Sequence, residues 1–288
     1  MNANAILGLT AQTFIHAGAS SSEAAIDLPI QREAHTDWPV IFGSGMKGAL
    51  RSHFETLLAQ PSDTVAIFGP DTNNAAEHAG ALLVSDARLV LLPVRSMTSH
   101  VKWVTCPALL KRLQNDLRRM AMPELTLPDF TKVNANQALS AQGAGKVYLE
   151  EFCFDTQTED LVAVLELLTF LGGQDLKADF AQNLLIVSND QFRLLCRSAV
   201  PVQAHIALDS ATKTVKNGAL WYEENLPPET LMYCCLSCTS GRDQQKTSAT
   251  ELLSKLENGF EQKGFMQVGG NLTTGMGWFQ VNWQGVQA

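Results

Sequence analysis

The chain has 288 residues, of which 45% are hydrophobic, so it can bury a substantial core in one elaborated domain or two small ones. A formal net charge of −8 and a pI of about 5.2 argue against a generic nucleic-acid coating protein, which is usually basic. Any RNA must therefore be bound by a local basic face. Since no apolar run is long enough for a membrane span and the N-terminus lacks the basic region of a signal peptide, we expect a cytoplasmic protein.

Alternating apolar residues predict strands, and helical periodicity predicts helices. The strands are expected over residues 3–15, 82–94, 184–188, 203–208, 230–238, 265–268 and 278–283. The helices are expected over residues 44–58, 107–120, 188–197 and 248–262. Ser44, Ser188 and Ser248 are the predicted N-caps, and residues 17–25 are expected to form a mobile loop. Twice the order is strand, helix, strand with antiparallel additions, which indicates an α+β fold with a ferredoxin-like pattern.

One stretch does not fit this pattern. Residues 121–150 contain prolines and glycines and little periodicity. We interpret this stretch, extended to about residue 160, as an insertion in a single domain over residues 1–288. It is the expected projecting or disordered element.

The six cysteines favour a structural role. Cys235 and Cys238 have the C-x-x-C spacing of a zinc site, but no second pair or nearby histidine cluster supplies the other two ligands. The alternation around them predicts buried thiols on a strand.

The segment from residue 26 to residue 51 places an acid before a helix. Asp27 lies between the apolar Ile26 and Leu28, where an ionised carboxylate is costly unless it is exposed or paired. The residue could be a metal ligand or a general acid–base group in phosphodiester cleavage, or it could be a turn residue that bonds its own backbone. In the helix that follows, Lys47 and Arg51 share a face, and Gly48 allows close approach of a backbone. With the positive helix N-terminus, they predict a phosphate-binding element.

A glycine-rich loop near the C-terminus offers a second candidate contact with phosphate. Its backbone N–H groups and two hydroxyls could hold an anion, although a tight turn between strands explains the composition equally well. The residues concerned are Gly269, Gly270, Thr273, Thr274 and Gly275.

Three further side chains are candidates for chemistry. His16 ends the first strand, and histidine suits proton transfer or metal binding, but a solvated histidine at a strand end is the commoner case. Glu223 and Glu224 follow Trp221 and Tyr222. This acid pair could hold a metal or orient a hydroxyl, or it could be a charged strand edge.

Three motifs carry a resemblance to a known family. They are IDLPIQREAHTDWPVIFGSGMKGALR from residue 26 to residue 51, VRSMTSHVKWVTCP from residue 94 to residue 107, and VGGNLTTGMGWFQV from residue 268 to residue 281. Together they resemble the RAMP superfamily of CRISPR proteins, and within it the backbone subunits of type III-B (Cmr) effector complexes. This resemblance implies a ferredoxin-like (RRM-like) core, formed from both chain ends, with an inserted thumb and helical elements. Relatives often carry an acid where this chain has Leu272 and a base where it has Met276.

The resemblance also implies a function. The chain would bind guide (CRISPR) RNA, assemble with copies of itself and other Cmr subunits, and cut complementary target RNA at regular intervals as an endoribonuclease that requires Mg²⁺ or Mn²⁺. Asp27 would be the catalytic residue and metal ligand, helped by His16 and by Glu223 or Glu224. Lys47, Arg51 and the C-terminal loop would bind guide phosphates. No membrane partner is expected.

Two alternatives remain open from the sequence. The chain could be a structural RNA-binding subunit without cleavage activity, or a RAMP endonuclease that processes guide RNA precursors with His16 as general base. A metal requirement and several cuts in one target would separate the main hypothesis from both. The sequence does not give the copy number, the metal, or which of the two adjacent glutamates takes part.

Overall fold

A computed structural model describes residues 2–20, 25–71, 78–123, 126–131, 133–242 and 246–285 of the chain. Its strands are β1 (Ala3–Ala11), β2 (Val40–Ile41), β3 (Leu82–Val84), β4 (Ala87–Ser96), β5 (His100–Thr105), β6 (Gln137–Ser140), β7 (Gly145–Leu149), β8 (Phe152–Thr158), β9 (Leu184–Ile186), β10 (Val202–Leu208), β11 (Val215–Glu224), β12 (Leu231–Cys238), β13 (Phe265–Gln267) and β14 (Trp278–Gly285). Its helices are α1 (Gly43–Phe54), α2 (Pro61–Phe68), α3 (Pro107–Arg119), α4 (Val162–Gly172), α5 (Lys177–Asn183), α6 (Asn189–Ser198) and α7 (Ala249–Gln262), with short 3₁₀ turns η2 (Gln174–Leu176) and η3 (Leu272–Thr274). In these ranges, no helix combines the length and the hydrophobicity that a membrane span requires.

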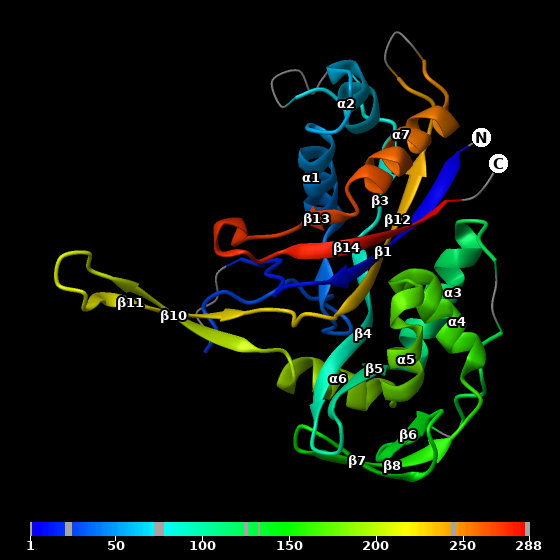
Figure 1. The fold of residues 1–288 in the computed structure, drawn as a ribbon, viewed down its shortest axis with the longest axis vertical. Coiled ribbons are helices and arrows are strands. Elements are labelled where there is room, and N and C mark those ends of the chain that lie inside the picture. The colour runs from blue at the N-terminus through cyan, green and yellow to red at the C-terminus, as the bar shows by residue number, and fades with distance from the viewer. Residues whose placement is uncertain are drawn as a thin grey trace.

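The centre of the molecule is a ferredoxin-like sheet. Strands β14, β1, β12 and β4 lie side by side in that order, and every pairing between them is antiparallel. In chain order α1 lies between β1 and β4, and α7 lies between β12 and β14, with the short strand β13 between α7 and β14. The order of the main elements is therefore the split βαβ arrangement. The first and last strands of the chain are neighbours, and both termini lie at the same end of the sheet (Figure 1). The predicted α+β, ferredoxin-like fold is confirmed.

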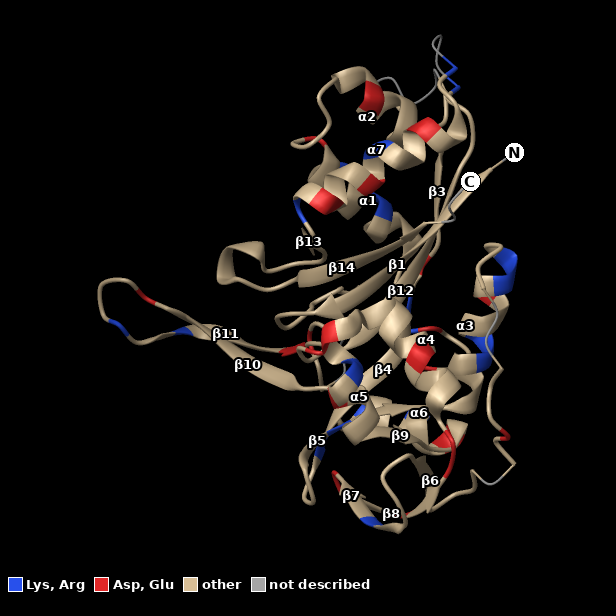
Figure 2. Ribbon diagram, turned by 45° about the vertical axis from the view of Figure 1, so that its right-hand side comes forward, with Lys and Arg blue, Asp and Glu red and all other residues tan. Residues whose placement is uncertain are grey.

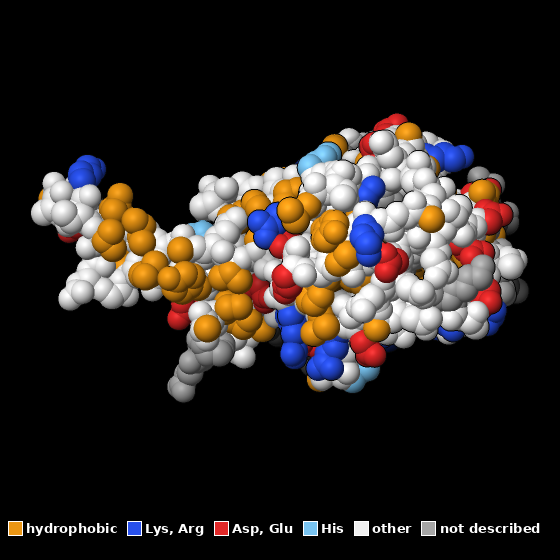
Figure 3. Space-filling view, turned by 90° about the horizontal axis from the view of Figure 1, so that it is seen from below, with side chains coloured by type: hydrophobic (Ala, Val, Ile, Leu, Met, Phe, Trp, Pro, Cys, Tyr) orange, Lys and Arg blue, Asp and Glu red, His pale blue; other side chains and the backbone are white. Residues whose placement is uncertain are grey.

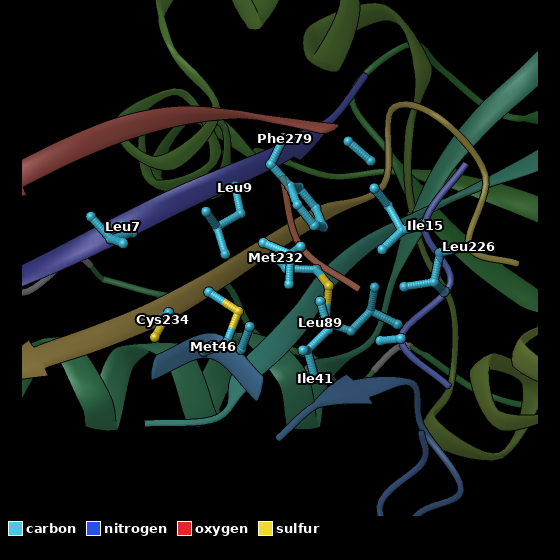
Figure 4. Packing of buried hydrophobic residues seen from close by; sticks show 14 of the residues in the cluster. Leu7, Leu9, Ile15, Ile41, Met46, Leu89, Leu226, Met232, Cys234 and Phe279 are labelled. Carbon is cyan, nitrogen blue, oxygen red and sulfur yellow. The ribbon is translucent and has the colours of Figure 1, made fainter. Parts of the chain in front are cut away.

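Strand β1 separates two hydrophobic clusters because successive side chains of a strand point to opposite faces. Ala5, Leu7 and Leu9 belong to the cluster that includes α1 and α7. Ile6 belongs to the other cluster, which includes α3 and α4. Figure 4 shows Leu7 and Leu9 packed with residues of β12, β14 and α1 in the first cluster. Burying each leucine contributes roughly 1.5–3 kcal/mol, so β1 is held firmly up to the point where the chain leaves it.

Most predicted elements are present, with local differences. Ser188 and Ser248 cap their helices as predicted, accepting from the N–H groups of Gln191 and Glu251. The Ser44 cap is wrong: α1 begins at Gly43, and the distant Asp86 accepts from the Gly43 N–H at 2.7 Å. A side chain brought by tertiary structure thus replaces a local cap.

The strand predicted over residues 82–94 is divided into β3 and β4, and the first strand ends at residue 11 rather than 15. Helices α2, α4 and α5 and strands β5 and β11 had no prediction. Part of the predicted mobile loop, residues 21–24, lies outside the described residues. The buried cysteine interpretation holds, since Cys234, Cys235 and Cys238 are all buried on β12.

The projecting element is not where the sequence predicted it. Of the described residues in the expected insertion, 137–158 form β6, β7 and β8, which extend the sheet through β9 and touch β4. The structure instead has a two-stranded arm, β10 and β11, that stands away from the body (Figure 1). The arm forms regular strands because its apolar and polar residues alternate. Glycines and prolines, on which the prediction for residues 121–150 was based, do not by themselves make a segment project from the body. Whether residues 121–160 are the family's thumb remains a prediction.

Candidate functional site

Three segments that are distant in the sequence meet beyond the end of β1. The chain leaves β1 and runs through Ile15 and His16, beside the residues that follow β11 and the loop that precedes β14. Ile15 forms an antiparallel bridge with Leu226, and the N–H of Gly270 donates to the His16 carbonyl at 2.9 Å. Figure 2 shows acidic residues gathered at the place where β11 joins the body. The structure therefore brings His16, the acid pair and the glycine loop together.

His16 is held in one orientation. Its Nδ1 lies 2.8 Å from the carbonyl oxygen of Glu224. Because a carbonyl only accepts hydrogen bonds, Nδ1 carries the proton in this contact, and in the neutral ring Nε2 has the free lone pair. A Cβ atom on Gly18 would lie 2.8 Å from Nε2, and one on Gly269 would lie 2.4 Å from the His16 carbonyl. The lack of a side chain at Gly18 leaves room for the ring at Nε2, and the lack of one at Gly269 lets the C-terminal loop approach the His16 carbonyl.

Glu223 is the acid that faces the histidine. Its Oε1 lies 3.8 Å from His16 Nδ1 and accepts a hydrogen bond of 2.6 Å from the side-chain amide of Asn271. The residue is only 4% exposed. A carboxylate so buried needs such partners, because removing an unpaired charge from water is costly.

Glu224 has different partners. The guanidinium of Arg32 donates to its Oε1, and the N–H of Ile30 donates to its Oε2 at 3.1 Å. Arg32 also donates to the backbone carbonyls of Asp37 and Cys196. Both oxygens of Glu224 are thus bound by the protein itself, and this acid joins β11 to the segment after residue 27.

Asp27 is half-buried. Its Oδ2 accepts from the N–H of Tyr222 at 2.7 Å, and the next residue, Leu28, forms a parallel bridge with Glu223. Asp27 is therefore fixed to β11 just before the acid pair. The contact is not the local turn bond that the alternative interpretation assumed, since its partner is 195 residues away.

The described residues contain no group of three or more His, Cys, Asp or Glu side chains that could hold a metal ion. A metal cage made of protein ligands alone does not fit this site. A divalent cation held mainly by phosphate oxygens and water, with one carboxylate from the protein, is a different arrangement and needs no such group.

The predicted phosphate-binding residues lie on helix α1. Lys47 is half-buried, and its pKa is lowered by burial and by the nearby Arg51 and Arg242. The guanidinium of Arg51 donates to the carbonyls of Gly69 and Pro70, and its Nε donates to Glu55 at 3.0 Å. Gly48 is exposed, with open space where a side chain would stand. Lys47 and Gly48 thus retain the predicted character, whereas Arg51 is engaged in holding the end of α2.

The C-terminal loop is a compact turn. The N–H groups of Thr274, Gly275 and Met276 donate to carbonyls within the loop, and the Thr274 hydroxyl donates to the carbonyl of Asn271. Fewer backbone N–H groups are therefore available to bind an anion than the sequence predicted. Thr273 is exposed.

The sequence did not predict two contacts of the site, the one between Asn271 and Glu223 and the one between Arg32 and Glu224. For the contact of Asn271, the only indication in the sequence was an asparagine within a glycine-rich turn.

Comparison with known proteins gives the family. The RAMP superfamily model matches residues 8–280. The CRISPR system Cmr endoribonuclease Cmr4 of Pyrococcus furiosus is 33% identical over 284 residues, covering 96% of this chain and 94% of that protein. A crystal structure of oligomeric Cmr4 from Pyrococcus furiosus superposes with a TM-score of 0.77 at 26% identity, over 99% of each chain. A chain of the type III-B Cmr-beta complex bound to cognate target RNA has the same fold, with a TM-score of 0.76 at 21% identity over 98% of this chain and 97% of that chain. The chain therefore belongs to the RAMP superfamily and, within it, to the Cmr4 family.

Proposed function

We propose that this chain is a backbone subunit of a type III-B CRISPR (Cmr) effector complex, which binds guide RNA and cuts complementary target RNA. The Pyrococcus furiosus relative, 33% identical, is named an endoribonuclease, which supports the activity. The observation that carries the proposal is the fixed histidine: His16 has its Nδ1 proton on a carbonyl, so Nε2 is available, with Glu223 beside the ring. A purely structural RNA-binding subunit would not need this arrangement.

The chemistry suited to this site is attack by a 2′-hydroxyl on the adjacent phosphate. Nε2 of His16 would accept the 2′-hydroxyl proton as the new 2′-oxygen–phosphorus bond forms. The bond from phosphorus to the 5′-oxygen breaks, and the 5′-oxygen takes a proton from solvent, leaving a 2′,3′-cyclic phosphate and a 5′-hydroxyl. The His16–Glu224 contact orients the ring during proton transfer, and Glu223 stabilises the imidazolium that forms.

Of the two adjacent acids, Glu223 is the one we assign to catalysis. Both oxygens of Glu224 are bound by Arg32 and Ile30, so Glu224 holds the site together. Asp27, fixed by the Tyr222 N–H, would face the phosphate and supply the protein's carboxylate for a Mg²⁺ or Mn²⁺ ion that arrives with the RNA. Such an ion stabilises charge on the scissile phosphate.

The deciding experiment uses the purified complex with end-labelled complementary RNA. We expect several products at regular intervals, their loss in excess EDTA, and an intact RNA–protein complex on a native gel in the same EDTA. Asp27→Asn should abolish cutting and leave guide binding and assembly unchanged. Cleavage that persists in EDTA would favour metal-free guide processing by His16, and a complex that binds but never cuts would favour the structural alternative.

The arm formed by β10 and β11 is the surface we propose for contact with a second copy of the chain. Ile206 pairs with Leu220 and Leu208 with Val215, so the two members of each pair lie on the same face of the arm, and each side chain is about half exposed. Figure 3 shows hydrophobic side chains running along this arm. A relative crystallised as an oligomer supports a copy of the same chain as the occupant.

The arm is tested by light scattering of the purified chain over a range of concentrations. Ile206→Lys with Leu220→Lys should lower the average mass of the assemblies, because two charges then lie in the proposed contact. Lys213→Glu, near the tip of the same arm, is the matched charge change outside the apolar face. Equal mass for the double variant and wild type would remove the arm from the interface.

A further inference from the structure

The C-terminal loop contacts both members of the proposed catalytic pair. The N–H of Gly270 donates to the His16 carbonyl at 2.9 Å, and the next residue, Asn271, donates its side-chain amide to Glu223 Oε1 at 2.6 Å. Both His16 and Glu223 are buried or nearly so. One short loop therefore positions both the backbone of His16 and the carboxylate of Glu223.

The backbone of Asn271 prepares this contact. Its φ is 61° and its ψ 28°, in the left-handed region that asparagine tolerates better than most residues. The Asn271 carbonyl accepts from the N–H groups of Thr274 and Met276 and from the Thr274 hydroxyl, at 2.9–3.2 Å. These bonds fix Asn271 as the residue directly before the turn η3. The amide is thus directed toward Glu223 by backbone geometry before any ligand arrives.

The position of Glu223 depends on that amide. Glu223 and His16 Nδ1 are 3.8 Å apart, longer than a hydrogen bond, so the histidine alone does not fix the carboxylate. The Asn271 contact to Oε1 is short and lies in a nearly dry site, where a hydrogen bond to a charged group is strong.

We propose that Asn271 is a positioning residue that holds Glu223 beside His16 and thereby couples the C-terminal loop to the cleavage site. This inference rests on the proposed function, since it presumes that the chain cuts RNA with His16 and Glu223. Displacing the loop would then release the acid without removing any group that touches RNA at the reacting phosphate.

The test variant is Asn271→Asp, assembled into the complete complex with guide. Aspartate has the same size and tolerates the left-handed backbone, but it presents an oxygen to Glu223 in place of the donating amide. Two carboxylates would then face each other, and Glu223 should move away from His16. We expect the single-turnover cleavage rate to fall tenfold or more while the dissociation constant for target RNA changes less than twofold. Asn258→Asp, the same exchange at an exposed position of α7, is the matched control and should cut at the wild-type rate.

The reciprocal exchange separates positioning from mere structural support. Asn271→Asp with Glu223→Gln restores an amide–carboxylate pair with the charge on the other residue. We expect this double variant to regain the wild-type melting temperature but not the cleavage rate. Wild-type cleavage by the single or the double variant would overturn the proposal, and so would a loss of RNA affinity as large as the loss of rate. If wild type and Asn258→Asp also fail to cut, the proposed function has failed instead.

Discussion

Two buried histidines, His16 beyond the end of β1 and His53 on α1, differ in what surrounds them. His16 is 9% exposed and meets polar groups: a backbone carbonyl at Nδ1, the carboxylate of Glu223, and glycines around the ring. His53 is 8% exposed and stacks on Phe260 with ring centroids 5.2 Å apart and an interplanar angle of 19°. The two side chains are equally buried, but His16 contacts polar groups and His53 packs against an aromatic ring. What distinguishes a candidate catalytic histidine is a fixed proton on one nitrogen and space beside the other.

The pKa of His53 reflects its apolar surroundings. Burial is the largest cause that lowers the pKa to about 4, and the positive charge of Lys263 lowers it further, against a backbone hydrogen bond at Lys263 that raises it. A histidine that stays neutral at physiological pH through packing contributes as an aromatic residue. His53 therefore belongs to the interface between α1 and α7, whereas His16 belongs to the site.

Among substitutions of the two histidines and the two adjacent glutamates, that of His16 should reduce cleavage most. His16→Gln removes the proton acceptor at Nε2 and should lower the single-turnover cleavage rate by about 10²–10⁴-fold, the usual contribution of a general base. His53→Phe preserves the aromatic stacking and should cut at the wild-type rate. Both variants are compared in complexes matched for guide content. Equal rates for the two variants would show that the environment of His16 has no catalytic meaning.

Substitutions of the two adjacent acids should affect different properties, the stability of the fold for Glu224 and the cleavage rate for Glu223. Glu224→Gln leaves Arg32 without its buried partner charge, and breaking a buried ion pair costs about 3–5 kcal/mol of unfolding free energy. Glu223→Gln keeps the size and an oxygen acceptor for Asn271, so it should cost less stability and lose cleavage instead. Urea denaturation of the isolated chain and cleavage by the complex measure the two losses. A Glu224→Gln chain as stable as wild type would contradict the structural role.

The pH dependence of the free energy of unfolding tests the environment of His53. His53 has a folded pKa of about 4, below its unfolded value near 6.5, so between these values the unfolded chain binds more protons. Stability from His53 is therefore present above about pH 6.5 and is lost as pH falls toward 4, by about 2 kcal/mol at pH 5. His53→Phe should lose less stability than wild type between pH 7.5 and pH 5 in urea titrations. Identical pH dependence in the two proteins would mean that folding does not change the pKa of His53.

How much of this was accessible from the sequence depends on the range of the interaction. The caps at Ser188 and Ser248 were predictable because cap and partner are three residues apart. The Asp86 cap of α1 and the Asn271–Glu223 bond were not, since they join residues that are brought together only by the complete sheet. The resemblance implied one site for His16, Asp27 and the acid pair. In the structure His16 lies beside both glutamates, and Asp27 accepts a hydrogen bond from Tyr222, directly before them. The choice between Glu223 and Glu224 required the hydrogen bonds of each.

The smallest expected effect concerns α1, which buries His53 on one face and carries Lys47 and Arg51 on another. If Lys47 contacts a guide phosphate, Lys47→Gln should lower the slope of log affinity against log salt by about one unit and weaken binding equally for all RNA sequences. Arg51→Gln should change the slope less, because its guanidinium already donates to the carbonyls of Gly69 and Pro70, and should instead lower the melting temperature. RNA titrations at several salt concentrations, with thermal denaturation of the same proteins, measure both. An unchanged slope for Lys47→Gln would remove this face of α1 from the RNA interface and leave the helix with only the packing role that His53 exemplifies.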